Sequence, residues 1–372
     1  MKITLLHKTV NAREAGFEFA VDSELEPYFR ELRTLRVVVH GGEIDVAHAS
    51  DFFFVAIAPL AWILGAEIES QEQVSHSGRL TIDAVGSYLA NHYRWRGRLA
   101  LQNLRTVIRR PALTSRRALM FSGGVDSLAA LINVGVEVDT LIHLLNFDRL
   151  FSDISTQQHE LDLSDMQEMA VGQGKRLVTI ETNIADILRH GRFDRFFPGR
   201  CSFWYGLQHV NHAAAAISVL SEFEEIFLSG SFDKLHEQVG SCAARSQFVE
   251  RYTPHAGLRL VQEHMLRQAK IEMILDRNPA LLSRLRVCYS SGDRTCTRCE
   301  KCLGTAMMVV AGGGSLASTS FPPGTEAALA ARLRELRDAP VNHSLLTEQA
   351  LNGRTLGGTR AQRFARLEAL LA

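Results

Sequence analysis

The sequence has no excess of charge of either sign. Its 41 lysine and arginine residues balance its 41 aspartate and glutamate residues, so the formal net charge at pH 7 is zero. Domains that cover nucleic acid usually carry a clear basic excess. The balance therefore argues against a large nucleic-acid footprint.

The chain also has no apolar run long enough to suggest a membrane span, which needs about 20 predominantly apolar residues. The most apolar run, 52–65, is interrupted by Pro59. The runs 201–221 and 302–325 lack Lys, Arg, Asp and Glu but are broken by polar residues or glycines. We expect all three to be buried core segments. The apolar run at the start of the chain is too short for a secretory signal, which predicts a cytoplasmic location.

Cysteine is scarce, with six residues in 372, but four of them cluster with the spacing C-x7-C-x2-C-x2-C. They are Cys288, Cys296, Cys299 and Cys302. Four thiolates held close together favour tetrahedral Zn²⁺. An iron–sulfur cluster and redox-active thiols remain alternatives, whereas a disulfide pair is not expected in a cytoplasmic enzyme.

A short apolar run ends at Phe121 and is followed by Ser122-Gly123-Gly124-Val125-Asp126-Ser127, which opens a helix-forming stretch. The sequence has no Walker A lysine here and no Gly-x-Gly-x-x-Gly. The two glycines permit a sharp turn whose N–H groups face an anion, and the helix N-terminus adds a positive partial charge. Ser122 and Ser127 supply hydroxyl groups. Asp126 could cap the helix or hold Mg²⁺.

Strands and helices alternate beyond this point, which predicts an α/β fold with a parallel sheet and helices on both faces. Ligands of such sheets bind beyond the carboxyl ends of the strands. The expected strands are 118–121, 139–146, 176–181 and 225–229, and the expected helices are 126–134, 156–172, 204–223 and 260–275.

Three domains are expected. Residues 1–112 form an accessory α+β domain with short strands at 2–8, 17–21 and 35–40. Residues 113–312 hold the loop and the four cysteines. Residues 313–372 form a helical C-terminal extension, with apolar residues at helical spacing in 325–337 and 361–371.

The loop resembles the PP-loop of ATP pyrophosphatases, whose sheet is of the adenine nucleotide alpha hydrolase (HUP) type. Loop and cysteines together resemble the 7-cyano-7-deazaguanine synthase (QueC)-like family, closest to the variants encoded in bacterial anti-phage operons. The resemblance covers residues 115–312 and leaves the first hundred or so uncovered.

This resemblance implies a ligase that binds ATP and Mg²⁺, with Zn²⁺ on the four cysteines. The enzyme would adenylate a carboxylate such as that of 7-carboxy-7-deazaguanine, release pyrophosphate and form an amide with ammonia or a protein amine, in anti-phage defence. The alternative product is the nitrile, 7-cyano-7-deazaguanine, made for queuosine. The loop Phe121–Ser127 would bind ATP, with Ser122, Asp126 and Ser127 as its catalytic residues.

Substrate contacts are expected from Arg200, which a carboxylate or phosphate could meet bidentately, and from Ser231 and Asp233 after the fourth strand. The expected partners are ATP, a deazaguanine-type small molecule and an acceptor protein from the same operon; nucleic acid and membranes are not expected, and the oligomeric state is open. Two other functions stay open: a PP-loop tRNA-modifying enzyme and a non-catalytic nucleotide-binding scaffold.

Overall fold

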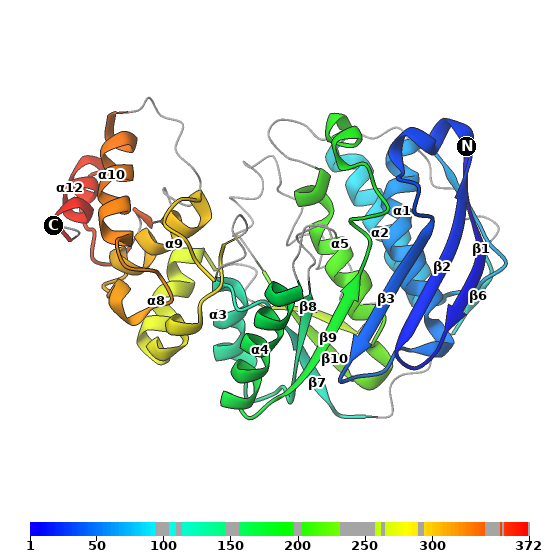
Figure 1. Ribbon diagram of the computed structural model, residues 1–372, viewed down its shortest axis with the longest axis horizontal. Coiled ribbons are helices and arrows are strands. Elements are labelled where there is room, and N and C mark those ends of the chain that lie inside the picture. The colour runs from blue at the N-terminus through cyan, green and yellow to red at the C-terminus, as the bar shows by residue number, and fades with distance from the viewer. Residues whose placement is uncertain are drawn as a thin grey trace. The chain divides into compact units, whose positions relative to one another are not determined.

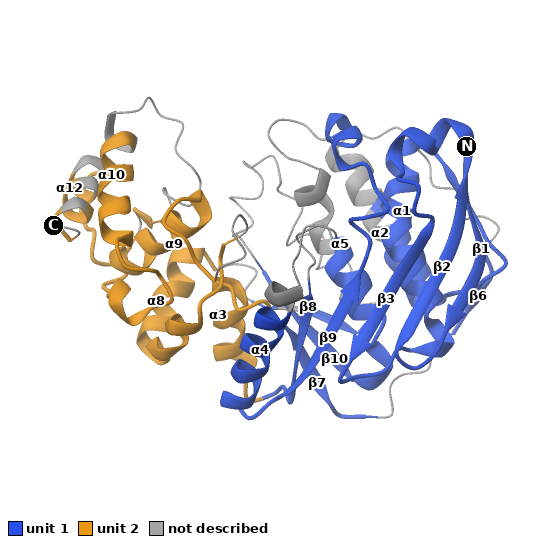
Figure 2. Ribbon diagram, in the orientation of Figure 1, with its two compact units in different colours: residues 1–120, 137–263 blue, residues 121–136, 264–372 orange. Residues whose placement is uncertain are grey.

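The structure is a computed structural model. It describes residues 1–93, 104–108, 114–145, 156–196, 203–230, 257–261, 265–288, 294–338, 350–351 and 353–370. The chain divides into two compact units (Figure 2). Unit 1 consists of residues 1–120 and 137–263, and unit 2 of residues 121–136 and 264–372.

Unit 1 is built on a nine-stranded sheet in the order β11-β10-β7-β8-β9-β3-β2-β1-β4 (Figure 1). The strands are β1 (Lys2–Val10), β2 (Glu14–Val21), β3 (Thr34–His40), β4 (Glu67–Glu69), β7 (Arg117–Met120), β8 (Thr140–Leu145), β9 (Arg176–Thr182), β10 (Glu225–Ser229) and β11 (Leu258–Val261). A separate short pair joins β5 (Val74–Ser75) to β6 (Thr106–Val107).

Five neighbouring strands, from β11 to β9, run parallel, and β9, β3, β2 and β1 pair antiparallel. Burial follows this division, because parallel strands are covered on both faces and antiparallel ones can face water on one side. In β8 five of six residues are buried. In β3 burial alternates: Leu35, Val37 and Val39 face the core, whereas Arg36 and His40 are exposed.

Helices α1 (Ser50–Leu64), α2 (His76–Tyr93), α4 (Thr156–Gly172) and α5 (Phe203–Ile217) belong to unit 1. Helix α1 packs against α2 and α5, and α4 packs against β8 and β9. Every residue of α1 is buried, and α1 ends at Gly65, which adopts a left-handed conformation with φ 65°. Val46–Leu64 is long and apolar enough to cross a membrane, but 83% of its apolar 18-residue window is buried in the fold. The expectation that the run 52–65 is a core segment is confirmed.

Unit 2 is helical in its described residues. Its helices are α3 (Val125–Val134), α8 (Arg267–Arg277), α9 (Glu300–Ala311), α10 (Thr325–Asp338) and α12 (Arg360–Leu370). Helix α3 packs on α8, and α9 contacts α8, α10 and α12. A 3-10 helix, Pro279–Arg284, links α8 to the extended segment that reaches the cysteines.

The predicted α/β class with a large, mostly parallel sheet is confirmed. The expected strands and helices from 118 to 229 occur with small changes at their ends, although α5 ends at Ile217, six residues earlier than expected. The helix expected over 260–275 was partly wrong. Leu258–Val261 pairs in parallel with β10, and α8 begins only at Arg267 after an extended Leu266.

Of the strands described in residues 1–93, all but the short β5 belong to the same sheet as the later strands. Strand β3 pairs with β9 through the registers Val37↔Thr182 and Val38↔Glu181. The backbone groups of β9 that would otherwise form an exposed sheet edge are thereby satisfied. The compact units are bounded at residues 120, 136 and 263, and the expected domain boundaries at 112 and 312 stay a prediction.

Candidate functional site

The loop follows β7, which lies between β8 and β10 in the sheet. Gly123 has φ +73°, a left-handed conformation that disfavours side chains. Gly124 is the N-cap residue of α3 and is extended, and no side chain caps this helix. The first N–H groups of α3 therefore lack a capping side chain, which is the arrangement that suits a bound anion.

Two hydroxyl groups fix the shape of the loop. The Ser127 hydroxyl donates to the carbonyl oxygen of Gly124 at 3.0 Å, and the Ser122 amide donates to the Ser127 hydroxyl at 3.3 Å. The amide of Gly124 donates to the Ser122 hydroxyl, also at 3.3 Å. Ser127 is buried and Ser122 is exposed. Ser127 thus supports the loop from within, while Ser122 can reach a ligand.

Asp126, which is partly buried, forms a charge cluster with two buried residues of α8. Its Oδ2 accepts from an Arg267 Nη atom at 2.7 Å, and its Oδ1 accepts from Lys270 Nζ at 2.8 Å. The side chain of Lys270 is 0% exposed and that of Arg267 8%. Burial alone would raise the pKa of Asp126, but the charges and hydrogen bonds of Arg267 and Lys270 outweigh it and hold this pKa well below its usual range.

This cluster bears on the two roles expected of Asp126, as a cap of α3 and as a Mg²⁺ ligand. Asp126 does not cap α3, because its carboxylate points to Arg267 and Lys270. Both of its oxygens are bonded to cationic groups, which repel a divalent cation. The arrangement therefore does not fit Asp126 as a Mg²⁺ ligand.

The four clustered cysteines bring their sulfur atoms together. All four Sγ atoms lie within 4.8 Å of one another. Four thiolates at about 2.3 Å from a tetrahedral Zn²⁺ would be spaced by about 3.8 Å, so the cluster is compatible with zinc. None of the four is disulfide-bonded.

Backbone amides orient these thiols. The amide of Cys296 donates to Cys302 Sγ at 3.3 Å, and that of Cys299 donates to Cys296 Sγ at 3.3 Å. Cys299 also caps α9, where its Sγ accepts from the Cys302 amide at 3.4 Å. Burial raises the pKa of the Cys302 thiol. A metal must supply the stabilisation of that thiolate, so metal binding should release protons.

One extended segment joins the cysteines to the loop within unit 2. The amide of Arg286 donates to the carbonyl oxygen of Gly123 at 2.9 Å, and Cys288 follows two residues later. The amides of Val287 and Cys288 both donate to the carbonyl oxygen of Arg294, at 2.9 and 3.1 Å. The two motifs, more than 150 residues apart in sequence, are thus one short segment apart in space.

Sequence reasoning missed Arg267 and Lys270. They are three residues apart and so share one side of α8, which also buries Ile271 and Ile274. The available signal was the position of these two cations on the apolar side of a helix. Lysine and arginine are seldom buried without a partner, so this position indicates a buried ion pair. The predicted substrate residues Arg200, Ser231 and Asp233 lie outside the described residues.

No protein-family model, curated protein or solved structure matches this chain.

Proposed function

We propose that the loop Phe121–Ser127 binds the phosphates of ATP and that the chain is a ligase that activates a carboxylate. The observation that carries this is the uncapped N-terminus of α3 behind two glycines, with two buried cations beside it. N–H groups, a helix dipole and positive charge in one place are what a polyphosphate requires.

In the proposed reaction a substrate carboxylate oxygen attacks the α-phosphorus of ATP. The bond between that phosphorus and the bridging oxygen breaks, and pyrophosphate leaves with the electron pair. An amine then attacks the acyl carbon, loses a proton and displaces AMP to form an amide. The chain needs no nucleophile of its own for these steps, so its contribution is positioning and electrostatic stabilisation.

Each residue of the site has a role in this proposal. The N–H group of Gly123, the first N–H groups of α3 and the Ser122 hydroxyl would hold the departing pyrophosphate. Asp126 would act indirectly, by holding Arg267 and Lys270 at the start of α3. Zn²⁺ on the four cysteines would fix the segment that supports Gly123, a structural role outside the chemistry.

The resemblance to QueC-like proteins supplies the substrate class: 7-carboxy-7-deazaguanine or a similar acid, with ammonia or an operon-encoded protein as the amine, in a cytoplasmic anti-phage system. The test is incubation of the chain with ATP, Mg²⁺, this acid and each amine. We expect AMP and pyrophosphate in equal amounts. Release of ADP and phosphate, or nucleotide binding without turnover in the presence of either amine, would exclude the ligase.

Replacing Gly124 with alanine should reduce this turnover by roughly 100-fold, because ligand displacements near 1 Å have effects of that size. Gly124 has φ −78°, which alanine tolerates, so the fold should survive. An added Cβ would lie 3.3 Å from the Ser122 Oγ and 3.4 Å from the Arg286 carbonyl oxygen, beside the surface offered to the anion.

The matched control for this substitution is Gly172→Ala. A Cβ at Gly172 would meet nothing within 4 Å. Turnover in this control should equal that of the wild type. Equal turnover in Gly124→Ala and wild type, measured as AMP release, would show that the loop does not hold the phosphates.

A further inference from the structure

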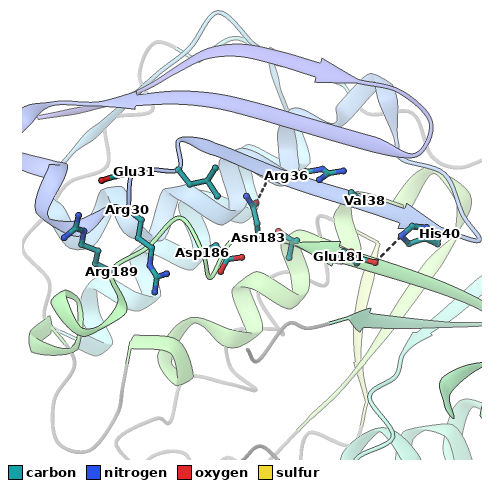
Figure 3. A pocket seen from close by; sticks show the side chains of 11 residues that line it. Arg30, Glu31, Arg36, Val38, His40, Glu181, Asn183, Asp186 and Arg189 are labelled. Atoms are coloured by element: carbon teal, nitrogen blue, oxygen red, sulfur yellow. Dashed lines mark hydrogen bonds and ion pairs between the residues drawn. The ribbon is translucent and has the colours of Figure 1, made fainter. Parts of the chain in front are cut away.

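A pocket of about 830 Å³ lies on the sheet of unit 1, and none of its lining residues belongs to the proposed ligase site (Figure 3). Its floor is the face of β3 and β9 that carries Val38 and Glu181. Residues 30–32 and the turn after β9 close one end of it. The volume is that of pockets that take small organic ligands.

Two arginines stand at that end, one on each side of an isolated antiparallel bridge, Phe29↔Leu188. Arg30 donates through Nε to the carbonyl oxygen of Leu188 at 3.1 Å. Arg189 donates through Nε to the carbonyl oxygen of Phe29 at 2.8 Å. Each guanidinium is therefore held by the other strand of the bridge, which removes much of the rotational freedom of its side chain.

The outer edge of each guanidinium remains available. Neither Arg30 nor Arg189 forms an ion pair with a carboxylate among the residues that the structure describes. The other basic groups of the pocket differ, since Arg36 pairs with Glu14 and His40 with Glu181. The two Nη atoms of an arginine match the two oxygens of a carboxylate or phosphate.

The pocket floor is rigid beside this pair. Asn183, directly after β9, accepts from the Arg36 amide at 2.7 Å and donates to the Thr34 carbonyl oxygen at 2.8 Å. Its side chain thus fastens the end of β9 to β3 just beyond their last paired residues, Val37 and Thr182. A ligand would meet a preformed surface, which lowers the entropic cost of binding.

We propose that this pocket binds a small molecule or chain terminus through an oxyanion, a carboxylate or a phosphate, held by Arg30 and Arg189. Val38 would carry the body of the ligand. The His40–Glu181 pair, 3.2 Å apart, offers polar groups at the far end. This site shares no residue with the loop, so the proposal stands whether or not the ligase is found.

The test is thermal unfolding of the full chain, followed by tryptophan fluorescence, with inorganic phosphate or succinate at fixed ionic strength. All three tryptophans belong to unit 1, so this signal reports on the unit that holds the pocket. We expect a saturable rise of Tm with one of the two anions, because a ligand of the native state stabilises it. Whichever anion saturates at the lower concentration identifies the group as phosphate or carboxylate.

In Arg30→Gln and Arg189→Gln the half-saturating concentration should rise at least tenfold. Arg30→Lys keeps the charge but loses the planar fork and should also bind more weakly than the wild type. Arg192→Gln is the matched control, since Arg192 is exposed in the same unit and outside the pocket, and it should bind as the wild type does. No saturable rise, or unchanged binding in both glutamine variants, would overturn the proposal.

Discussion

Replacing Asp126 with alanine should lower the free energy of unfolding of unit 2 by about 3–5 kcal/mol. The change leaves Lys270, with 0% side-chain exposure, and Arg267, with 8%, as buried charges without their carboxylate. Breaking a buried pair by removing one partner costs that much, because the remaining charge keeps its desolvation penalty. Hydrogen exchange of the amides in α3 and α8 is the measurement, since unit 2 holds no tryptophan.

The matched control is Asp276→Ala in the same unit. Asp276 accepts from Arg354 Nη1 at 2.7 and 2.8 Å, but it is 55% exposed, and exposed pairs contribute at most about 1 kcal/mol. Adding Lys270→Met to Asp126→Ala should recover part of the loss, because it removes one of the two buried charges that lose the Asp126 carboxylate. Equal protection of the α3 and α8 amides from exchange in Asp126→Ala and Asp276→Ala would show that the Asp126 cluster does not stabilise unit 2 in this way.

Acid should act on the same cluster. The folded-state pKa of Asp126 lies below the unfolded value of about 3.9. The stability from this ionisation is therefore fully present above the unfolded pKa and is lost as the pH falls through the folded one. Between about pH 5 and pH 2 the protection of α3 and α8 should fall more steeply in the wild type than in Asp126→Asn. If amide protection fell equally with pH in the wild type and in Asp126→Asn, the ionisation of Asp126 would not contribute to this loss of stability.

Removing the metal should open the cysteine segment while leaving unit 1 intact. We expect about one zinc ion per purified chain, because the four Sγ atoms fit a tetrahedral ion. A chelator, or Cys302→Ser, should speed hydrogen exchange in the first turn of α9 and in 285–288. Cys302 is fully buried and Cys299 caps α9, so both lose their positions when the ion leaves.

Cys201→Ser is the control for this experiment, because it removes a cysteine that is not part of the C-x7-C-x2-C-x2-C motif and should leave the zinc content unchanged. Visible absorption typical of an iron–sulfur cluster, or a chain without any metal and with unchanged exchange on chelation, would contradict the zinc assignment.

Local patterns in the sequence were enough for most elements of the parallel half of the sheet. A run such as Thr140–Leu145, in which apolar residues occupy positions on both faces, is typical of a buried parallel strand. The four cysteines and the glycine loop were equally visible, because spacing alone brings C-x2-C thiols together and permits a tight turn.

Long-range partners were not predictable in this way. Asp126 and Lys270 are 144 residues apart, and nothing in the loop sequence tells whether its carboxylate caps α3 or meets α8. The pairing of β3 with β9 was not predictable either. The alternation of apolar and polar residues in β3 indicates a strand with one solvent-exposed face, but it does not identify the strand beside it. The helix predicted over 260–275 overlaps the end of β11 (Leu258–Val261), because a short apolar run is compatible with either structure when its neighbour β10 is not known.

The hydrogen bond from the Arg286 amide to Gly123 has a thermodynamic consequence. If loss of the ion at Cys288 loosens this bond and weakens nucleotide binding by some factor, then bound nucleotide must tighten the hold on the ion by the same factor. Nucleotide should accordingly slow the transfer of zinc to a chelator. Bound zinc would then favour nucleotide binding, and bound nucleotide would favour retention of zinc.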